Sequence, residues 1–513
     1  MKSTIVLLFV LFLFNAQSQE AEAFNASFEF TDQVKTKGGV GQGLIGYDGE
    51  YTYTMGSKGF VLNGIPIGIK FIINKWDKDM NLIKVGEVPM KTKDYKLGVY
   101  HPGVFKIIGN KLIHIIEYKN KKIAKMEVFI TEYDKNTFAV KNTEKITSYD
   151  YKNKMESNVT VIASPGNQSE FGIMALVGNR NESKTKAEIF IFNDDLESVY
   201  EEELEFETPI YGLRIINEII DENSLSFVDI DSPVREKRSD DAEPDVVTFH
   251  MLGRESGDHI EMPIQLDEIE RNISDFEFTF NDAGQLFISG FYEAIGEQNN
   301  DVGGAFTQLY DLSKEELVDQ STLPFGFEFL TENASDRTKK KAAKKSAKGK
   351  SFDPYQYLVR HVIANEDGSS TLVGECYRYY TTTTTDSQGR TRTTHHYIHG
   401  DLIIMRTSRD GEIEWVERMQ KYVHSTGSDM GQFIFHDNEK TFEIIYGGGR
   451  SLTIAQIDKE DGSSEKEVVF TKEDLDKMAL IMNNAAQVGD HSYTIQARRG
   501  KKTKILNVEF DQE

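Results

Sequence analysis

Ile72–Lys78 (IINKWDK) and Phe129–Lys135 (FITEYDK) share one pattern, an apolar run that ends in an aromatic residue and is followed by a polar turn. β-Branched and aromatic residues favour strands, whereas Asp, Asn and Gly favour the turns between them. The pattern recurs along the whole chain. Further copies are Phe190–Asp194, Gln308–Asp311, Thr453–Lys459 and Asn507–Asp511, and weaker copies are Thr248–Leu252 and Ile403–Arg406.

The copies recur at a nearly constant spacing. Each copy contains one anchor residue near its end: Trp76, Tyr133, Phe192, Leu252, Tyr310, Arg406, Ile457 and Phe510. Successive anchors are 57, 59, 60, 58, 96, 51 and 53 residues apart. The long interval contains a basic loop insert at 333–352 and a Thr-rich hairpin excursion at 380–398, and it shortens to 57 residues without them. Such a period indicates a repeat architecture of eight units.

Each unit is expected to be a meander of three or four strands. Lys111–Tyr118, Ile123–Tyr133 and Thr137–Ile146 are separated only by short polar turns, as in consecutive hairpins. Helical periodicity is confined to Lys339–Lys348 and Lys472–Leu480.

In β-propellers, meanders are repeated radially, and this arrangement protects the exposed sheet edges. The chain resembles the β-propeller superfamily in its repeated meanders, over nearly the whole of residues 19–513. The resemblance implies an all-β fold with a single β-propeller, eight blades being favoured over seven; two stacked sandwich domains are the other alternative. The last unit lacks an outer strand after Phe510. The N-terminal run at Phe24 and Ala26–Phe30 is expected to supply it, so that pairing of the N- and C-terminal strands closes the ring.

The segment Asp401–Trp415 resembles a strand-turn-strand repeat of exported bacterial propellers, in which a turn Gly precedes a Trp by four residues. Gly411 and Trp415 match, and Ser408, Asp410 and Trp415 also approach the structural Asp-box of sialidases. We expect Gly411 to adopt a positive φ and Trp415 to pack between blades.

The first eighteen residues have the features of a secretory signal peptide. Lys2 precedes the apolar run Ile5–Phe14, and small residues follow at Ala16 and Ser18. Ten apolar residues are too few to span a bilayer. We therefore expect cleavage after Ser18, a propeller domain at 19–513 without a transmembrane span, and export to the periplasm or beyond. The leader resembles those of exported proteins in the Bacteroidetes group of bacteria.

Composition narrows the classes of partner. The formal net charge is −24, with 83 acidic and 59 basic side chains, which argues against nucleic-acid binding. Cys376 is the only cysteine, so the chain forms no internal disulfide. None of the local catalytic motifs G-x-S-x-G, H-E-x-x-H or C-x-x-C is present, and the sequence requires no cofactor.

Two segments in the long interval are candidate sites. His395, His396 and His399 are candidate ligands of zinc or copper, although His395 and His396 would point to opposite faces of an extended strand. Nearby polar, basic and aromatic residues are candidates for partner binding: Tyr379, Tyr380, Arg390, Arg392, Lys339, Lys340 and Lys341.

The sequence therefore favours an exported binding or scaffold propeller of the cell envelope that contacts protein or polysaccharide. The alternative is a hydrolase or lyase acting on extracellular glycan, with its site assembled from several blades at the mouth of the propeller.

Overall fold

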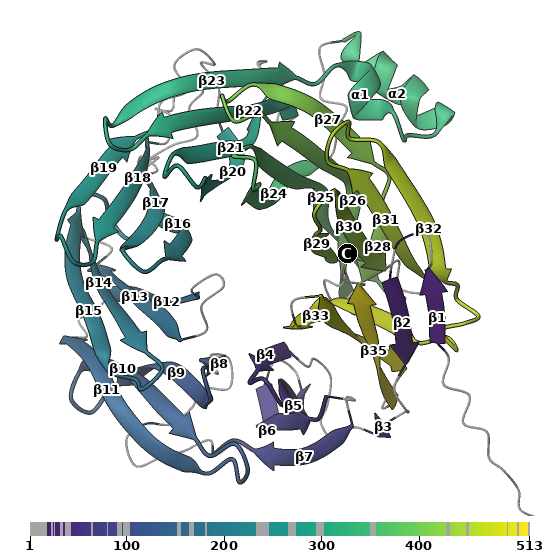
Figure 1. Cartoon of the computed structure of the whole chain (residues 1–513). Helices are drawn as coiled ribbons and strands as arrows, with labels where there is room; N and C mark the ends of the chain where they lie inside the picture. Colours follow the sequence, from purple (N-terminus) through teal and green to yellow (C-terminus); the bar gives the residue numbers. More distant parts are fainter. Residues whose placement is uncertain are drawn as a thin grey trace, which may run out of the picture.

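The computed structural model contains eight antiparallel sheets arranged as a ring, an eight-bladed β-propeller (Figure 1). The two alternative predictions, a seven-bladed propeller and two stacked sandwich domains, are therefore wrong. The structure describes residues 18–21, 24, 26–30, 34–35, 43–62, 65–78, 81–89, 95, 103–150, 155–163, 169–179, 182–231, 246–264, 273–293, 302–348, 355–426, 431–447, 451–489, 491–499 and 502–510.

The first four blades are consecutive four-stranded meanders. Blade 1 contains β4 (Gly43–Tyr47), β5 (Thr52–Leu62), β6 (Ile65–Trp76) and β7 (Leu82–Glu87). Blade 2 contains β8 (Val104–Ile108), β9 (Lys111–Asn120), β10 (Lys125–Tyr133) and β11 (Val140–Asp150). Blade 3 contains β12 (Met155–Ala163), β13 (Glu170–Asn179), β14 (Thr185–Asn193) and β15 (Ser198–Phe206). Blade 4 contains β16 (Leu213–Ile220), β17 (Ser224–Asp231), β18 (Val246–Gly253) and β19 (His259–Pro263).

The last four blades include the two inserts and both ends of the described part of the chain. Blade 5 contains β20 (Ile273–Phe280), β21 (Leu286–Glu293), β22 (Val302–Asp311) and β23 (Glu316–Pro324), followed by α1 (Phe327–Thr331) and α2 (Asp336–Ser346). Blade 6 contains β24 (Gln356–Ala364), β25 (Ser370–Thr385), β26 (Thr391–Thr407), β27 (Ile413–Met419) and the added β28 (Val423–Thr426). Blade 7 contains β29 (Phe433–Asp437), β30 (Thr441–Gly447), β31 (Leu452–Asp458) and β32 (Ser464–Phe470). Blade 8 contains β33 (Ala479–Gly489), β34 (Ser492–Arg499), β35 (Lys502–Phe510), β1 (Ser18–Ala21), β2 (Ala26–Phe30) and β3 (Val34–Lys35).

All eight anchors of the sequence repeat occupy equivalent positions. Each is the last or next-to-last residue of the third strand of its blade, from Trp76 at the end of β6 to Phe510 at the end of β35. In several blades the pairing with the outer strand shifts register at the anchor, as between Lys75 and Trp76 and between Glu132 and Tyr133. The repeat detected in the sequence is therefore the third strand and the turn that follows it.

The N-terminal strand pairs with the C-terminal strand as predicted. Ala26 lies opposite Phe510 and Phe30 opposite Leu506, so β2 supplies the outer strand that β33–β35 lack. Phe28 from β2 packs edge-on against Phe470 of blade 7. The predicted leader lies outside the described residues except for Ser18, so its cleavage stays a prediction.

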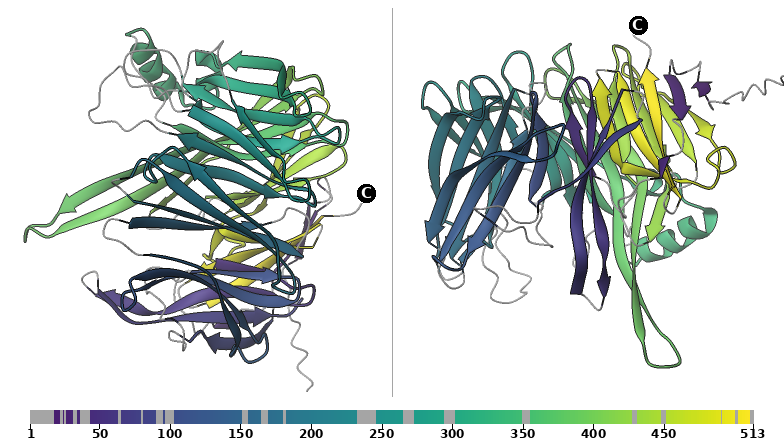
Figure 2. Two further views of the ribbon diagram at one scale, coloured as in Figure 1. Left: turned by 90° about the vertical axis from the view of Figure 1, so that its left-hand side faces the viewer. Right: turned by 90° about the horizontal axis from the view of Figure 1, so that it is seen from below.

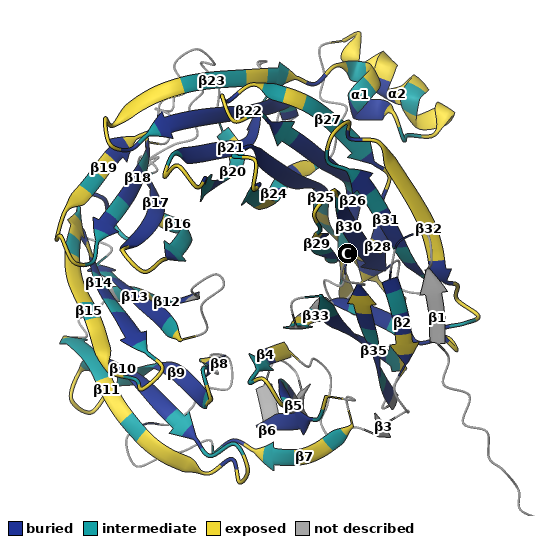
Figure 3. Ribbon diagram, in the orientation of Figure 1, coloured by how far each residue is buried: buried dark blue, intermediate teal, exposed yellow. Residues whose placement is uncertain are grey.

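The core lies between neighbouring blades. Central strands such as β17 are buried on both faces, whereas outer strands such as β15 contain only exposed and half-buried residues (Figure 3). Blades packed face to face explain this, because both faces of a central strand then contact a neighbour. Trp415 shows the packing directly: its indole donates to the carbonyl of Lys459 in blade 7 at 3.3 Å, and Gly411 has a φ of +97°, both as expected.

The helical candidates had different outcomes. The helical candidate at Lys339–Lys348 is confirmed, because a helix forms over Asp336–Ser346 within the insert that was otherwise predicted as a loop. Ser335 caps its N-terminus by accepting from Thr338 N, and Ala342 is buried beneath it. Residues 472–477 form turns instead of a helix, and β33 begins at Ala479. Within the described residues, no helix has the length and apolar character to cross a membrane.

Candidate functional site

A long hairpin formed by β25 and β26 projects from blade 6 well beyond the body of the ring (Figure 2). Thr385 pairs with Thr391 at its tip, and Gly389 in the turn has a φ of +78°. In a meander, the connection between the second and third strands leaves the same edge as the connection to the next blade. The hairpin and helix α2 therefore lie on one face of the ring, named the insert face below, as both views in Figure 2 show.

Aromatic and imidazole rings cover both surfaces of the hairpin near its base. On one surface, Tyr379 packs against Tyr397 at 5.2 Å between ring centroids, and its hydroxyl group lies 2.7 Å from His395 Nδ1. Tyr379 remains 48% exposed. Part of this ring surface is therefore accessible to a partner.

The opposite surface carries a continuous stack of cationic and aromatic groups. The Tyr380 and His396 rings are parallel, with centroids 4.5 Å apart, and the Arg378 guanidinium lies 4.9 Å from the Tyr380 centroid. His424 from β28 extends the stack, because its Nε2 lies 3.1 Å from His396 Nδ1. Arg390 and Arg392 are exposed nearer the tip. This surface presents flat rings beside positive charge.

The three histidines predicted as metal ligands have separate partners. His395 contacts Tyr379, and His396 lies on the other surface, where its Nε2 is 2.8 Å from the Thr382 hydroxyl oxygen. His399 is fully buried and bonds to Glu375. The structure does not bring the three imidazoles together.

A buried ion cluster lies where the hairpin joins the ring. Glu375 on β25 is fully buried and accepts hydrogen bonds from His399 Nδ1, Lys421 Nζ and Arg360 Nε. A register shift in β25–β26 places His399 on the face of Glu375. Burial raises the pKa of Glu375, but the hydrogen bond from His399 and the surrounding positive charges outweigh it and lower the pKa to about 2. The cluster fixes the base of the hairpin.

A second ion pair attaches the helical insert to the same blade. Arg418 donates from Nε to Asp401 at 2.8 Å and from Nη1 to the carbonyl of Phe329 in α1 at 2.7 Å. Asn333 donates to the same Asp401 carboxylate at 3.2 Å. Of the basic residues predicted to bind a partner, Lys340 and Lys341 on α2 are exposed and Lys339 is half-buried.

Polar residues on the innermost strands link the blades around the inside of the ring. Asn217 on β16 donates to the carbonyl of Phe276 on β20 at 3.0 Å. Asp275 on β20 accepts from the backbone N–H of Val359 on β24 at 2.8 Å. The imidazole of His361, also on β24, packs against Phe435 of blade 7 at 5.6 Å.

Among the titratable groups of this inner wall, Glu277 has the pKa that lies nearest to neutral pH. Burial raises its pKa to about 7, the charge of Asp275 acts in the same direction, and the charge of Arg360 opposes both. Sequence reasoning identified neither carboxylate, because inner strands from different blades meet only after the ring has formed.

A cavity of about 700 Å³ lies on the opposite face of the ring, where turns of blades 5 and 6 meet. The turns at 281–285, 311–315 and 408–412 define this side, named the turn face below. Its lining includes the carboxylates of Asp311, Asp319, Asp410 and Glu412 beside Arg409.

No protein-family model matches the chain, and no curated protein matches it in sequence. Three similar solved structures are the apocarotenoid oxygenase of Synechocystis, the polysaccharide lyase Uly1 and Sqt1 of Saccharomyces cerevisiae. Their identities to this chain are 9%, 10% and 8%, with TM-scores of 0.37, 0.37 and 0.39. The alignments cover 88%, 83% and 93% of this chain and 94%, 94% and 97% of theirs. The assignment of the fold rests on the eight sheets of the chain itself.

Proposed function

We propose that this protein is a binding propeller that captures an anionic polysaccharide on its insert face. The observation that carries the proposal is that the projecting hairpin and helix α2 leave the same face of the ring (Figure 2). Both also carry exposed cations, such as Arg390 on the hairpin and Lys340 on the helix. Inserts on one face of a repeat protein are typical of a binding surface.

Charge segregation supports an anionic partner. Residues 377–399 contain three arginines and one acidic residue, and residues 333–348 contain seven lysines and arginines and one acidic residue, although the whole chain has a charge of −24. A local basic surface on an acidic protein attracts polyanions, and the attraction weakens as salt screens it.

Exposed rings support a sugar as the occupant. Tyr379 is 48% exposed and Tyr422, which precedes β28, is 62% exposed. Threonine hydroxyl groups extend from these rings to the tip on both strands of the hairpin. Flat amphipathic rings beside hydroxyl and guanidinium donors match the apolar faces, hydroxyl groups and carboxylate or sulfate groups of an acidic glycan.

The test is direct binding of the 19–513 chain to immobilised uronate, sulfated and uncharged polysaccharides, at low and high salt. We expect binding to the two anionic classes that weakens at least tenfold between about 50 and 300 mM salt. In one variant, an Asn-Gly turn replaces residues 381–395 and so joins Tyr380 directly to His396. These two residues are paired across the hairpin, so the shortened hairpin keeps its register. A second replaces Lys339, Lys340 and Lys341 with Gln.

Each variant is expected to lose most of the binding. The matched control replaces Lys78, Lys314 and Lys440 with Gln, because these three lysines lie in turns of the opposite face. Equal binding by the shortened hairpin and the full chain would contradict the proposal, and so would equal affinity for the uncharged polysaccharides.

Export of the chain is part of the proposal. The basic, apolar and small-residue segments of the leader support it. N-terminal sequencing of the protein from its native host should begin at Gln19, and recovery of an intact Met1 would contradict it.

The second candidate function is proton-transfer chemistry on a glycan inside the ring. It is favoured by the raised pKa of Glu277, which allows this carboxyl group to exchange a proton near neutral pH. Turnover of oligosaccharides, assayed as new reducing ends or new unsaturated products, should then disappear in Glu277→Gln. Binding without turnover of any anionic glycan would exclude it.

A further inference from the structure

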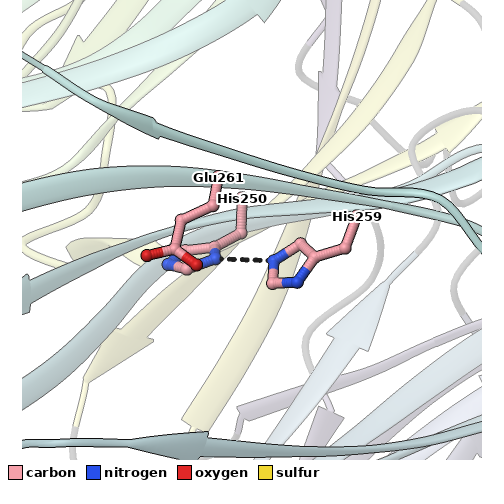
Figure 4. A group of neighbouring side chains, drawn as sticks. All are labelled: His250, His259 and Glu261. Atoms are coloured by element: carbon pink, nitrogen blue, oxygen red, sulfur yellow. Dashed lines mark hydrogen bonds between the residues drawn. The ribbon is translucent and has the colours of Figure 1, made fainter.

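Three potential metal ligands gather on blade 4, far in sequence from both inserts. They are His250 on β18 and His259 and Glu261 on β19 (Figure 4). One ligand atom from each residue lies within 4.8 Å of the other two. The described part of the chain contains one such group, and it differs from the histidines predicted from the sequence.

Strand register explains why the three side chains meet. Glu261 lies directly opposite His250 across the β18–β19 hairpin. His259, two residues before Glu261, projects from the same face of the sheet. On the other side of β18, Phe227 of β17 lies opposite His250.

The imidazole of His250 is held in one orientation. Its Nε2 lies 2.6 Å from Asp229 Oδ1, and the Phe227 ring stacks on it with centroids 4.8 Å apart. His250 and Asp229 are 4% and 7% exposed. A proton on Nε2 that is shared with the carboxylate directs the lone pair of Nδ1 toward His259, to which it is hydrogen-bonded and from which it can turn to a metal ion. A carboxylate behind the imidazole in this way supports metal-binding histidines.

The spacing of the two imidazoles and the exposure of the site suit a metal ion. His250 Nδ1 lies 2.9 Å from His259 Nε2, and two nitrogen ligands of tetrahedral zinc lie about 3.3 Å apart at ordinary Zn–N bond lengths. A small rotation of the exposed His259 side chain is enough to open this gap. His259 and Glu261 are exposed, so an ion can enter from solvent.

We propose that His250, His259 and Glu261 bind a first-row divalent metal ion, with zinc as the expected occupant. Two imidazoles and one carboxylate form a ligand set that zinc favours, and three protein ligands leave a coordination position for water or for a donor atom of a partner. Asp229 is a positioning residue that acts through His250. The inference is independent of the proposed polysaccharide surface.

Calorimetric titration of the 19–513 chain with zinc alone, at about pH 7.5 where neutral imidazole predominates, tests the site. We expect one ion per chain. His259→Ala and Glu261→Gln should each weaken binding at least tenfold; both side chains are exposed, so the fold should tolerate the changes. The matched control is His396→Ala on the hairpin, which should bind zinc like the unaltered chain.

Asp229→Asn should keep the stoichiometry and weaken binding between about tenfold and a hundredfold. Far-ultraviolet circular dichroism of this variant checks that blade 4 is intact. Anomalous scattering from a zinc-soaked crystal should place the ion between the three side chains. The proposal is overturned if zinc fails to bind saturably, if His259→Ala binds like the unaltered chain, or if binding depends on His396.

Discussion

Lys421 donates a hydrogen bond from its ammonium group to the carboxylate of Glu375, and neither side chain is accessible to solvent. The same ammonium group donates to the carbonyl of Gly431 at 2.9 Å. The pair thus connects the base of the projecting hairpin to the segment that enters blade 7. Because the charges are buried, each depends on its partners for compensation.

Removing one member of this pair should be costly. We expect Lys421→Met to lower the free energy of unfolding by about 3–5 kcal/mol, because Glu375 keeps a buried charge with one partner fewer. Urea denaturation measures the loss. Lys466→Met on the exposed strand β32 is the control and should change stability by less than about 0.5 kcal/mol. Equal losses in the two variants would mean that the pair contributes nothing.

Acid should weaken the same cluster. The pKa of Glu375 is lowered to about 2 in the folded chain, from an ordinary value of 4.5. A carboxyl group with a lowered folded-state pKa stabilises the fold above its unfolded-state pKa, and this contribution disappears as pH falls from about 4.5 to about 2. The stability difference between the unaltered chain and Glu375→Gln should therefore shrink over that window. Melting temperatures at several pH values test it, and a constant difference would contradict it.

Glu277 should have the opposite pH dependence. Its folded-state pKa is about 7, above the ordinary 4.5, so the folded chain retains a proton that the unfolded chain loses. Stability from this group falls as pH rises from about 4.5 to about 7. Glu277→Gln should therefore gain about 1–3 kcal/mol over the unaltered chain between pH 4 and pH 8, less than the full shift implies because the side chain is half-buried. Parallel urea midpoints at the two pH values measure the gain.

The fold could be predicted from sequence because its signal is local. Each anchor, such as Trp76 or Tyr133, lies beside the turn that follows it, so one short pattern identifies one blade. The pairing of β2 with β35 was predictable because one unit lacked a strand. The helix at Asp336–Ser346 was only partly predicted: its periodicity was recognised over Lys339–Lys348, but the insert as a whole was interpreted as a loop, since lysine-rich runs without a long apolar face give weak evidence of packing.

The contacts of the candidate sites were less accessible to sequence reasoning. His399 reaches Glu375 through a register shift, and strict alternation along a strand does not predict such a shift. Asp275 meets Val359 across two blades, a contact that no local pattern encodes. His250 and Glu261 were closer to prediction, because they flank the recognisable turn at Gly253–Asp258 and a hairpin register pairs them.

Gly431 should tolerate no side chain. A Cβ atom there would lie 2.1 Å from His399 Cδ2, and His399 cannot move away without losing both contacts to Glu375. We expect Gly431→Ala to lower the free energy of unfolding by about 2–4 kcal/mol. Gly43→Ala is the control, because nothing lies within 4 Å of its added Cβ. Urea denaturation of the two variants decides, and similar stabilities would show that the segment at Gly431 moves freely.

Cys376 should report the opening of this region. It is the only cysteine in the chain, follows Glu375 directly and is 1% exposed. Thiol-specific reagents cannot reach a buried cysteine in the folded chain. Labelling of Cys376 should therefore proceed only when blade 6 opens. Lys421→Met should accelerate labelling more than tenfold in native buffer, because the lost ion pair lies in the same blade, whereas Lys466→Met should leave the rate unchanged. Labelling of the unaltered chain at the rate of the urea-unfolded chain would show that the base of the hairpin is open in solution, and that the ion cluster does not fix the hairpin to the ring.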